Sequence, residues 1–427
     1  MIKKLFKNKV VNNASWIVGA KIFQMLTSLI VGVLTARYLG SADYGLVNYA
    51  SSYTAFFTSL CTLGINSVIV KEFIDNPGKE GEIIGTTLGL RALASILSAL
   101  SIISISMILD YGEPITQWVV ALHSLGAVFH IFEVFNYWYS SRLESKKTSI
   151  SALIAYGVMS VYKIILLASN ASVIYFAVAN SVDYIAVAVL LVGIYVKDKG
   201  QRLSFSLGYG KKLLSKSCHY IIPGLMVAIY AQTDKIMLKQ MIGAEEVGYY
   251  SVASSVCTMW CFVLAAIIDS LNPVIMEKHR ENEKEYKRLN RILYAIIFYV
   301  SIFVSLLFVL FGDIAIKILY GEEYMPAVLP LKVITWYTAF SYLGVARNSW
   351  IVCENKQKYL VYIYLASAVS NVVFNLIFLP IWGAVGAAFA SVLAQIITIV
   401  IPLFIKPLRP NTVLILEALI FKGLKKE

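Results

Sequence analysis

The sequence predicts an all-α integral membrane protein with twelve transmembrane helices in two bundles of six. Three observations lead to this fold class. The 427 residues are 59% hydrophobic and only 15% charged, whereas a soluble globular chain averages about 45–50% apolar and about 25% charged residues. Long apolar runs alternate with short basic segments, which is typical of helices that cross a bilayer. A motif near the N-terminus also returns at about half the length of the chain.

Each predicted transmembrane helix is one run of mostly apolar residues. A helix needs about 20 such residues to cross the hydrocarbon core, and the runs end at Gly, Pro, Asn or groups of charges. The first run follows a basic head like that of a signal peptide, but it exceeds the about 7–15 residues of a signal core, so we interpret it as a retained helix. The twelve predicted spans are residues 12–36, 44–66, 84–108, 115–137, 149–168, 172–196, 215–241, 247–272, 291–311, 328–351, 358–379 and 383–405.

Basic residues lie almost entirely on one side of this predicted topology. If the N-terminus is cytoplasmic, the internal segments carry 25 Lys and Arg residues, and the external segments carry only Arg37 and Lys317. Cytoplasmic loops of membrane proteins are enriched in Lys and Arg. The bias predicts that both ends of the chain are cytoplasmic and that the number of spans is even. It also accounts for the net charge of +12 without a nucleic-acid surface.

A repeated motif predicts two halves of the same orientation. The stretch "LGSADYGLVNYASS" (39–52) aligns with "IGAEEVGYYSVASS" (242–255) at an offset of 203 residues. We interpret each copy as the outer turn between the first two helices of its half, because glycine permits a tight turn. An acid just before the following helix, Asp43 or Glu246, suits the dipole of its N-terminus. The matched glycines are Gly40 and Gly45 in the first copy and Gly243 and Gly248 in the second.

Six spans return the chain to its starting side, so the two halves form a parallel repeat about an axis along the membrane normal. The predicted parts are an N-terminal six-helix bundle (1–196), a cytoplasmic linker (197–214), a C-terminal six-helix bundle (215–405) and a cytoplasmic C-terminal tail (406–427).

Polar residues also recur at equivalent places in the second helix of each half. We expect each set to lie on one helix face, and a polar stripe inside a membrane must face protein or water. Two equivalent stripes favour a central cavity lined by both halves; packing of helices through small residues is the alternative. The stripes are Asn48, Ser52, Ser59 and Asn66 in the first half, and Ser251, Ser255, Thr258 and Asp269 in the second.

Four stretches carry a family resemblance. "ARYLGSADYGLVNYASSYTAFFTSLCTLGINSVIVKE" (36–72) resembles the first hairpin of bacterial polysaccharide-repeat-unit flippases of the Wzx type, and "TDKIMLKQMIGAEEVGYYSVAS" (233–254) resembles the matching segment of their second half. "LYGEEYMPA" (319–327) and "LPIWGAVGAAFASVLAQ" (379–395) resemble their late turns. These flippases belong to the multidrug/oligosaccharidyl-lipid/polysaccharide exporter superfamily. The resemblance implies a V-shaped fold of two bundles, alternating access, and undecaprenyl-diphosphate-linked oligosaccharides as cargo.

Charged residues inside the predicted spans are candidates for binding such a cargo. A diphosphate is anionic, and Arg and Lys are the side chains that bind it. Lys21 and Arg91 are the preferred contacts; pairing with acids or snorkelling to the surface is the alternative, above all for Lys163 and Arg347. Asp234 and the adjacent Lys235 could instead form a structural pair. The candidate cavity residues are Lys21, Gln24, Ser28, Asn48, Ser52, Asn66, Arg91, Asp234, Lys235 and Asp269.

A second candidate set could relay protons or ions. His123 and His130 are seven residues apart in one predicted helix, and Glu133 and Asp183 supply acids within the spans. Histidine changes charge near physiological pH. Packing of polar groups toward a cavity is the alternative for this set. The five cysteines show no metal-ligand spacing, so we expect no metal and no cofactor.

One cytoplasmic segment stands out by its charge. "MEKHRENEKEYKRLNR" (276–291) has the composition of a solvated helix between two spans. It could also hold anionic lipid headgroups.

The sequence is compatible with three classes of function. The leading one is a flippase that moves lipid-linked oligosaccharide repeat units from the inner to the outer leaflet of the bacterial cytoplasmic membrane. The first alternative is an ion-coupled drug or cation antiporter of the same superfamily. The second is a membrane polysaccharide polymerase or ligase, but no loop carries a catalytic set or a phosphate-binding GxxxxGK[ST] motif, so we expect no enzyme. The expected partners are a polyprenyl-diphosphate-linked oligosaccharide, membrane lipids and other polysaccharide assembly proteins.

Overall fold

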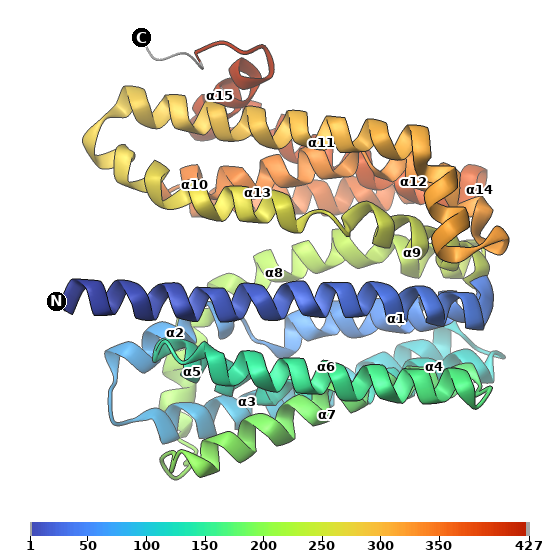
Figure 1. Cartoon of the computed structure of the whole chain (residues 1–427), viewed down its shortest axis with the longest axis horizontal. Helices are drawn as coiled ribbons and strands as arrows, with labels where there is room; N and C mark the ends of the chain where they lie inside the picture. The colour runs from blue at the N-terminus through green and yellow to red at the C-terminus, as the bar shows by residue number, and fades with distance from the viewer. Residues whose placement is uncertain (1, 424–427) are drawn as a thin grey trace. The chain divides into compact units, whose positions relative to one another are not determined.

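The computed structural model describes residues 2–423, and every regular element in that range is a helix. The chain divides into two compact units, one up to Ala228 and the other from Ile229 onward. We call them unit 1 and unit 2 and describe each by itself. The boundary falls inside helix α8 (Leu207–Met241), which belongs to both (Figure 1).

Unit 1 is a bundle of long helices with two shorter ones beside them. Its hydrophobic core gathers around Ile65, Phe135 and Trp138. The elements before α8 are α1 (Ile2–Cys61), α2 (Asn66–Asp75), α3 (Glu80–Leu109), α4 (Pro114–Phe129), η1 (His130–Glu133), α5 (Val134–Ser141), α6 (Ser145–Ala168) and α7 (Val173–Lys197).

Unit 2 is a second helical bundle with its own core around Leu293, Leu343 and Ile351. Its elements after α8 are α9 (Ala244–Thr258), α10 (Phe262–Glu281), α11 (Glu283–Tyr320), η2 (Glu322–Ala327), α12 (Val328–Ile334), α13 (Tyr337–Cys353), η3 (Gln357–Tyr359), α14 (Leu360–Val400), η4 (Ile401–Leu403), η5 (Lys406–Leu408) and α15 (Arg409–Leu419). The predicted C-terminal tail therefore contains a folded helix, and its residues 424–427 lie outside the described part.

Both repeat turns have the predicted glycine geometry. Gly40 has φ 72° and ψ 172°, and Gly243 has φ 145° and ψ 171°. A positive φ strains any residue with a Cβ atom, so glycine is the residue that suits both places. The chain reverses at Gly40, so α1 appears as two antiparallel legs in Figure 1. Glu246 was predicted just before the helix; it lies inside the first turn of α9, where an acid also suits the N-terminal dipole.

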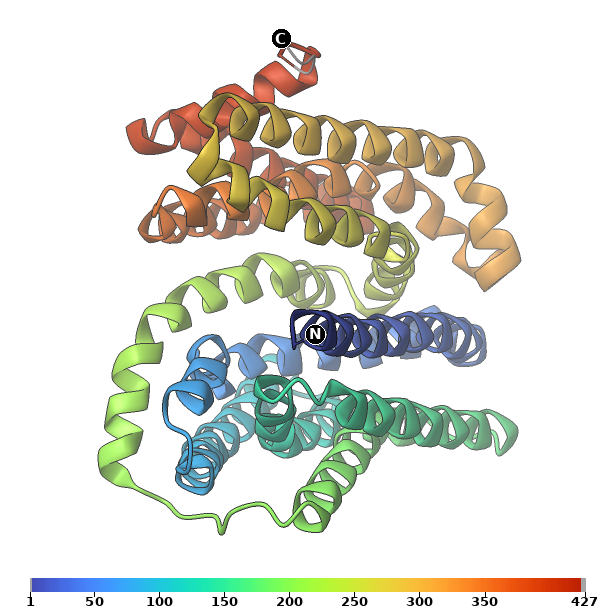
Figure 2. The ribbon, with the colours of Figure 1, turned by 60° about the vertical axis from the view of Figure 1, so that its left-hand side comes forward.

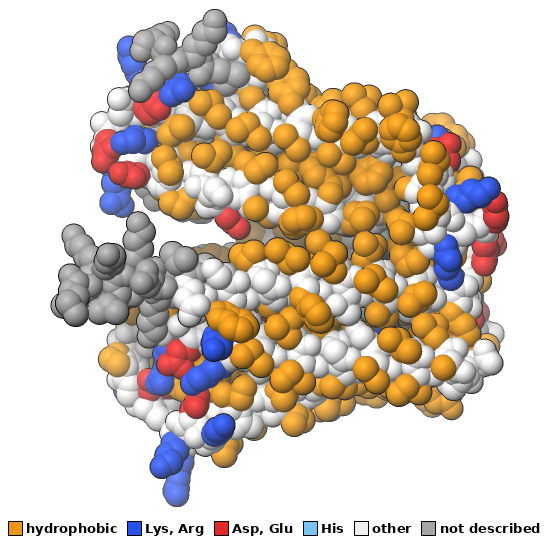
Figure 3. Space-filling model, viewed as in Figure 1, with side chains coloured by type: hydrophobic (Ala, Val, Ile, Leu, Met, Phe, Trp, Pro, Cys, Tyr) orange, Lys and Arg blue, Asp and Glu red, His pale blue; other side chains and the backbone are white. Residues whose placement is uncertain are grey.

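The helices are long and apolar enough for a multi-pass membrane protein. Among the described residues, eight continuous stretches qualify as membrane spans, or nine if the bent pair α9 and α10 counts as one. Two of the eight, 15–75 and 357–403, each contain two predicted spans joined at a glycine, Gly40 or Gly383. The predicted span 328–351 is divided between α12 and α13, and α13 has only 17 residues. In Figure 3 apolar side chains cover the flanks of the helices and charged ones gather near their ends.

The predicted polar stripes are wrong in one respect, because neither lies on a continuous helix. Leu63 and Gly64 have positive φ and end the second leg of α1, so Asn66 begins a separate helix. In unit 2 a bend of 41° separates α9 from α10, which carries Asp269. Each half thus breaks its second predicted span at a similar place.

The predicted span that carries His123 and His130 is one helical stretch, Pro114–Ser141, but a 3-10 turn interrupts its regular α-helix. Helix α4 ends at Phe129, and the four residues from His130 to Glu133 form a 3-10 turn before α5. A 3-10 turn has three residues per turn instead of 3.6, which rotates the following side chains away from the face of α4.

The predicted linker is bound to unit 1 along part of its length. The extended segment between α7 and α8 (Figure 2) lies against α3, where the Ser204 amide donates to the Gly81 carbonyl at 3.2 Å. A Cβ atom on Gly85 would lie 2.5 Å from the Ser204 carbonyl oxygen. Glycine at this position therefore allows the backbone of the linker to contact the helix directly.

Candidate functional site

Arg91 lies in the interior of unit 1. It projects from α3 and is 1% exposed. Its Nη2 donates to Asn66 Oδ1 at the start of α2. Its Nη1 lies 3.9 Å from Glu133 Oε2, while Nε and Nη1 have no hydrogen bond among the described residues. We call Arg91, Asn66, Glu133 and His130 the Arg91 cluster.

The 3-10 turn η1 places two predicted relay residues in this cluster. His130 Nε2 lies 3.5 Å from Glu133 Oε2. The His130 ring packs edge-on against Tyr184 of α7, with centroids 5.3 Å apart. The Glu133 side chain is 31% exposed, so the cluster is not sealed on this side.

The other two predicted relay residues, His123 and Asp183, have partners outside the Arg91 cluster. His123 is buried, and its Nδ1 lies 2.8 Å from Thr54 Oγ1 of α1. Lys163 of α6 interacts electrostatically with both His123 and Asp183. His123 and His130 therefore have different partners, and whether they act together in a relay stays a prediction.

The candidate residues on the first leg of α1 differ in their surroundings. Lys21 and Ser28 are exposed, and no partner for the Lys21 ammonium is recorded in residues 2–423. Gln24 donates to the Tyr156 hydroxyl of α6. Lys21 is thus a solvent- or lipid-facing cation within a predicted span, in contrast to Arg91.

Asn48 and Ser52 are bonded to their own helix. Asn48 Nδ2 donates to the Tyr44 carbonyl at 2.9 Å, and Ser52 Oγ donates to the Asn48 carbonyl at 2.9 Å. Ser52 is also buried. Such bonds satisfy a polar side chain without a ligand.

Asp234 forms the most complete polar cluster of unit 2. It projects from α8 and is 2% exposed. Oδ1 accepts from Asn371 Nδ2 at 2.8 Å and from Asn375 Nδ2 at 2.6 Å, both on α14. Oδ2 accepts from the Tyr250 hydroxyl of α9 at 2.7 Å and from the Ser391 hydroxyl of α14. We call these five residues the Asp234 cluster.

The remaining charged candidates of unit 2 are not part of that hydrogen-bond network. Lys235 interacts electrostatically with Asp234. Asp269 on α10 is exposed. Arg347 is buried on α13 and donates from Nη1 to the Thr398 carbonyl at 2.7 Å. Its burial excludes the alternative that it snorkels to the surface.

Neither Tyr250 nor Ser391 was predicted as a site residue, although both lie inside stretches that carry the family resemblance. A contact of Glu246 was not predicted either: its Oε2 accepts a hydrogen bond from the Ala384 amide at 2.6 Å. Ala384 follows Gly383, where φ is positive and a helix begins again inside α14. The carboxylate therefore binds the start of that helix. Motif membership was the available signal, because Tyr250, Glu246 and Gly383 all lie in quoted motifs.

The described residues contain no group of three or more His, Cys, Asp or Glu side chains that could hold a metal ion. The Arg91 cluster and the Asp234 cluster can interact with a ligand or with the helices of their own unit only through charge and hydrogen bonds. The Arg91 cluster has N–H groups that are not yet bonded, and the Asp234 cluster joins α8, α9 and α14.

Comparison with known proteins identifies the family. The profile of the family described as polysaccharide biosynthesis protein matches residues 10–279. The chain belongs to this family. A capsular polysaccharide biosynthesis protein, CapF of Staphylococcus aureus, is 19% identical over 397 residues, which is 92% of this chain and 98% of that protein. A putative O-antigen transporter of Shigella flexneri is 22% identical over 402 residues, or 89% of this chain and 94% of that protein.

Solved structures show the same fold. An inward-facing MATE family transporter of the MOP superfamily has a TM-score of 0.71 at 13% identity and covers 92% of this chain and 95% of its own. The lipid II flippase MurJ has a TM-score of 0.68 at 15% identity and covers 94% and 90%. The predicted fold class and the predicted resemblance to this superfamily are confirmed, and the apolar helices make the chain a multi-pass membrane protein.

Proposed function

We propose that this protein is a flippase for oligosaccharides linked to a polyprenyl diphosphate. It carries repeat units for a surface polysaccharide from the inner to the outer leaflet of the bacterial cytoplasmic membrane, with both termini in the cytoplasm. Family membership supports the polysaccharide pathway, and the fold shared with a lipid II flippase supports the type of movement. Two bundles that alternate between two arrangements would expose the cargo first inward and then outward.

The observation that carries this proposal is the state of Lys21. A charged side chain at the bilayer centre is costly, roughly 2.5–3.5 kcal/mol even on the lenient insertion scale. Lys21 lies within a predicted span, is exposed, and has no recorded partner in the described residues. An anionic diphosphate would offset that cost as a point-charge partner.

Arg91 has a different part in the proposal. It is buried beside Asn66, so it helps to hold α2 against α3. Its Nε and Nη1 groups still lack hydrogen bonds, and these groups are suited to phosphate oxygens. We therefore place Lys21 as the first contact of the diphosphate and Arg91 as a second contact that also supports the fold of unit 1.

The test uses cells that lack their own flippase and carry variants of this chain. Lys21→Ala should abolish most surface polysaccharide at an unchanged level of folded protein, and Lys21→Arg should retain part of it, because the charge is kept. Arg91→Ala should lower both transport and the folded level, and Arg91→Lys should restore part of each. Leu26→Ala, a change at an exposed residue of the same leg that is not a candidate cavity residue, is the matched control.

Normal export by Lys21→Ala would show that this cation does not bind the cargo. A second outcome concerns the antiporter alternative: if wild-type protein lowers drug accumulation in these cells but never restores surface polysaccharide, the cargo is a drug or cation, and the flippase proposal is wrong.

A further inference from the structure

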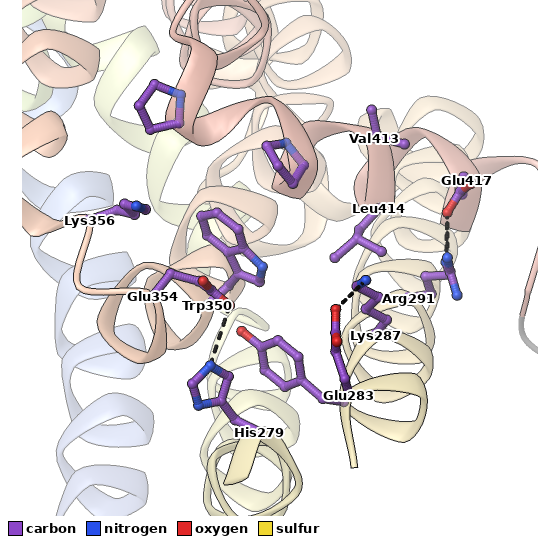
Figure 4. Close-up of a pocket in the computed structure, with 13 residues that line it drawn as sticks. His279, Glu283, Lys287, Arg291, Trp350, Glu354, Lys356, Val413, Leu414 and Glu417 are labelled. Atoms are coloured by element: carbon purple, nitrogen blue, oxygen red, sulfur yellow. Dashed lines mark hydrogen bonds and ion pairs between the residues drawn. The ribbon is translucent and has the colours of Figure 1, made fainter. Parts of the chain in front are cut away.

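A groove of about 800 Å³ lies at one end of unit 2, where the C-terminal segment meets the ends of α11 and α13 (Figure 4). Its lining comes from the end of α10, the start of α11, the end of α13, and the segment from Pro407 to Glu417. These are segments that the basic-residue bias predicts to be cytoplasmic. We call this feature the tail groove. Its volume lies in the range of ligand sites, about 300–1,000 Å³.

The acids of the tail groove are already paired with its own basic side chains. Three carboxylates line it, and each has a Lys, Arg or His side chain of the groove as its partner. The pairs are Glu283–Lys287 at 2.6 Å, Glu354–His279 at 3.4 Å and Glu417–Arg291 at 2.7 Å (Figure 4). The groove is therefore not an acidic site that would attract a cation.

Two lysines remain available to an anion. No ion pair of Lys356 is recorded in the part of the chain that the structure describes, and its side chain lines the groove. Lys287 is paired only with Glu283, and both side chains are largely exposed, at 47% and 78%. An exposed i,i+4 ion pair contributes little, so a stronger anion can displace Glu283 from Lys287. In Figure 4 Lys356 lies on one side of Trp350 and Lys287 on the other.

Helix α15 adds an apolar surface beside the groove. Val413, Leu416 and Ile420 are exposed and share one face by their spacing, and Val413 also lines the groove. Exposed Arg409 and Lys422 flank this face. A short helix with one apolar face and basic flanks is typical of a helix that lies in the membrane–water interface. The opposite side of α15 packs on α11.

We propose that the tail groove binds the phosphate headgroup of an anionic phospholipid from the cytoplasmic leaflet. Lys287 and Lys356 contact the phosphate, and the acyl chains lie along the exposed face of α15. Basic pockets on the cytoplasmic side of membrane helices bind such headgroups. This site goes beyond the proposed flippase function, because it lies within unit 2 and includes none of the residues assigned to the cargo.

The test measures the thermal unfolding midpoint of the full-length, detergent-purified protein against added lipid. The probes are short-chain phosphatidylglycerol, phosphatidylcholine with the same chains, and soluble glycerol phosphate. A ligand that binds the folded state raises the midpoint as its concentration passes the dissociation constant. Phosphatidylglycerol should raise it, and phosphatidylcholine and glycerol phosphate should not do so at the same concentration.

Matched lysine pairs locate the site. Lys287→Ala/Lys356→Ala removes the two groove lysines, and Lys284→Ala/Lys358→Ala removes two exposed lysines of the same segments that do not line the groove. The first pair should weaken the response to phosphatidylglycerol by about tenfold or more, and the control pair by less than about threefold, because each lysine near anionic lipid contributes about fivefold. Lys356→Arg should retain the response.

Equal losses in the two pairs would overturn the proposal, because they would show general attraction to the basic surface. An equal response to phosphatidylcholine would exclude charge recognition. An equal response to glycerol phosphate would make this a site for soluble phosphates and exclude the lipid. For the chains, Leu416→Gln/Ile420→Gln should weaken the response to phosphatidylglycerol, and an unchanged response would show that they do not lie on α15.

Discussion

The Asp234 cluster of unit 2 and the Arg91 cluster of unit 1 differ in how completely their buried charges are bonded. In unit 2 the Asp234 carboxylate accepts four hydrogen bonds from α9 and α14. In unit 1 the Arg91 guanidinium is bonded to Asn66, and its nearest acid, Glu133, lies 3.9 Å away. Four donors can satisfy the two oxygens of a carboxylate, whereas a guanidinium has five N–H groups to satisfy. The Asp234 carboxylate is therefore fully bonded, and the Arg91 guanidinium is not.

This difference shows that the repeat conserves the turns and not the charges. At the offset of 203 residues, Asp234 corresponds to Val31 and Arg91 corresponds to Tyr294. Gly40 and Gly243, in contrast, lie at equivalent positions, and both have a positive φ. A fully bonded network holds its elements together, and a partly bonded one can exchange partners. We therefore expect unit 2 to depend on its polar cluster for stability and unit 1 to use its cluster in transport.

The largest expected effect is in the Asp234 cluster. Asp234→Ala leaves four buried donors without their acceptor and should lower the free energy of unfolding by about 3–5 kcal/mol, the range for breaking a buried charged network. The measurement is the thermal unfolding midpoint of purified protein, together with the folded yield in membranes.

Asp269→Ala is the matched control, because Asp269 is an exposed acid within a predicted span of the same unit. Its folded yield should equal that of the wild type. If Asp234→Ala and Asp269→Ala give the same yield, the Asp234 cluster does not stabilise unit 2.

The next prediction concerns a feature that the two units share, a glycine with positive φ at the turn. Gly40→Val and Gly243→Val should each cost about 1–3 kcal/mol, because a β-branched residue is strained at positive φ. Both should reduce folded protein in the membrane. Gly157→Val is the control, since Gly157 has no positive φ and no atom within 4 Å of its added Cβ.

A normal level of both turn variants would mean that the turns tolerate side chains. A loss in only one of them would show that the two halves do not share the same constraint.

Effects smaller than that of Asp234→Ala are expected from removing one hydrogen-bond partner from each cluster. Ser391→Ala leaves Asp234 with three donors and should cost about 1 kcal/mol, whereas Asn66→Ala removes the hydrogen-bond acceptor of Arg91 and should cost about 1.5–3 kcal/mol, the range for bonds to charged groups. Unfolding midpoints of the two variants in one detergent give the comparison. If Ser391→Ala lowers the unfolding midpoint more than Asn66→Ala does, the expected ranking of the two hydrogen bonds is wrong.

Local patterns in the sequence sufficed for much of the fold. The length of apolar runs predicted the spans, and a glycine followed by an acid and a second glycine predicted both turns. The break at Leu63 and Gly64 and the 3-10 turn at His130 were not predicted, because Leu and His have no local requirement for such geometry.

The candidate sites were less predictable than the fold. Asp234 was recognised as an ionisable residue within a span, but its partners Asn371 and Ser391 lie 137 and 157 residues away. Arg91 was recognised as a cation, yet its burial against Asn66 depends on how α2 returns toward α3. The tail groove was not predicted, because its walls bring the turn between α10 and α11 together with the end of α13 and the segment from Pro407 to Glu417, which are distant in sequence.

The sequence by itself determined the membrane-spanning class, the twofold repeat and the turn glycines. The physical reason is that a bilayer selects apolar runs of a minimum length, and a positive φ selects glycine; both constraints act on neighbouring residues. Only the tertiary structure decided which polar groups meet, which cations are buried, and where the C-terminal helix α15 packs. Those contacts join residues of different helices, from 16 positions apart for Asp234 and Tyr250 to 157 for Asp234 and Ser391, so they depend on how the helices of each unit pack together and on no local pattern.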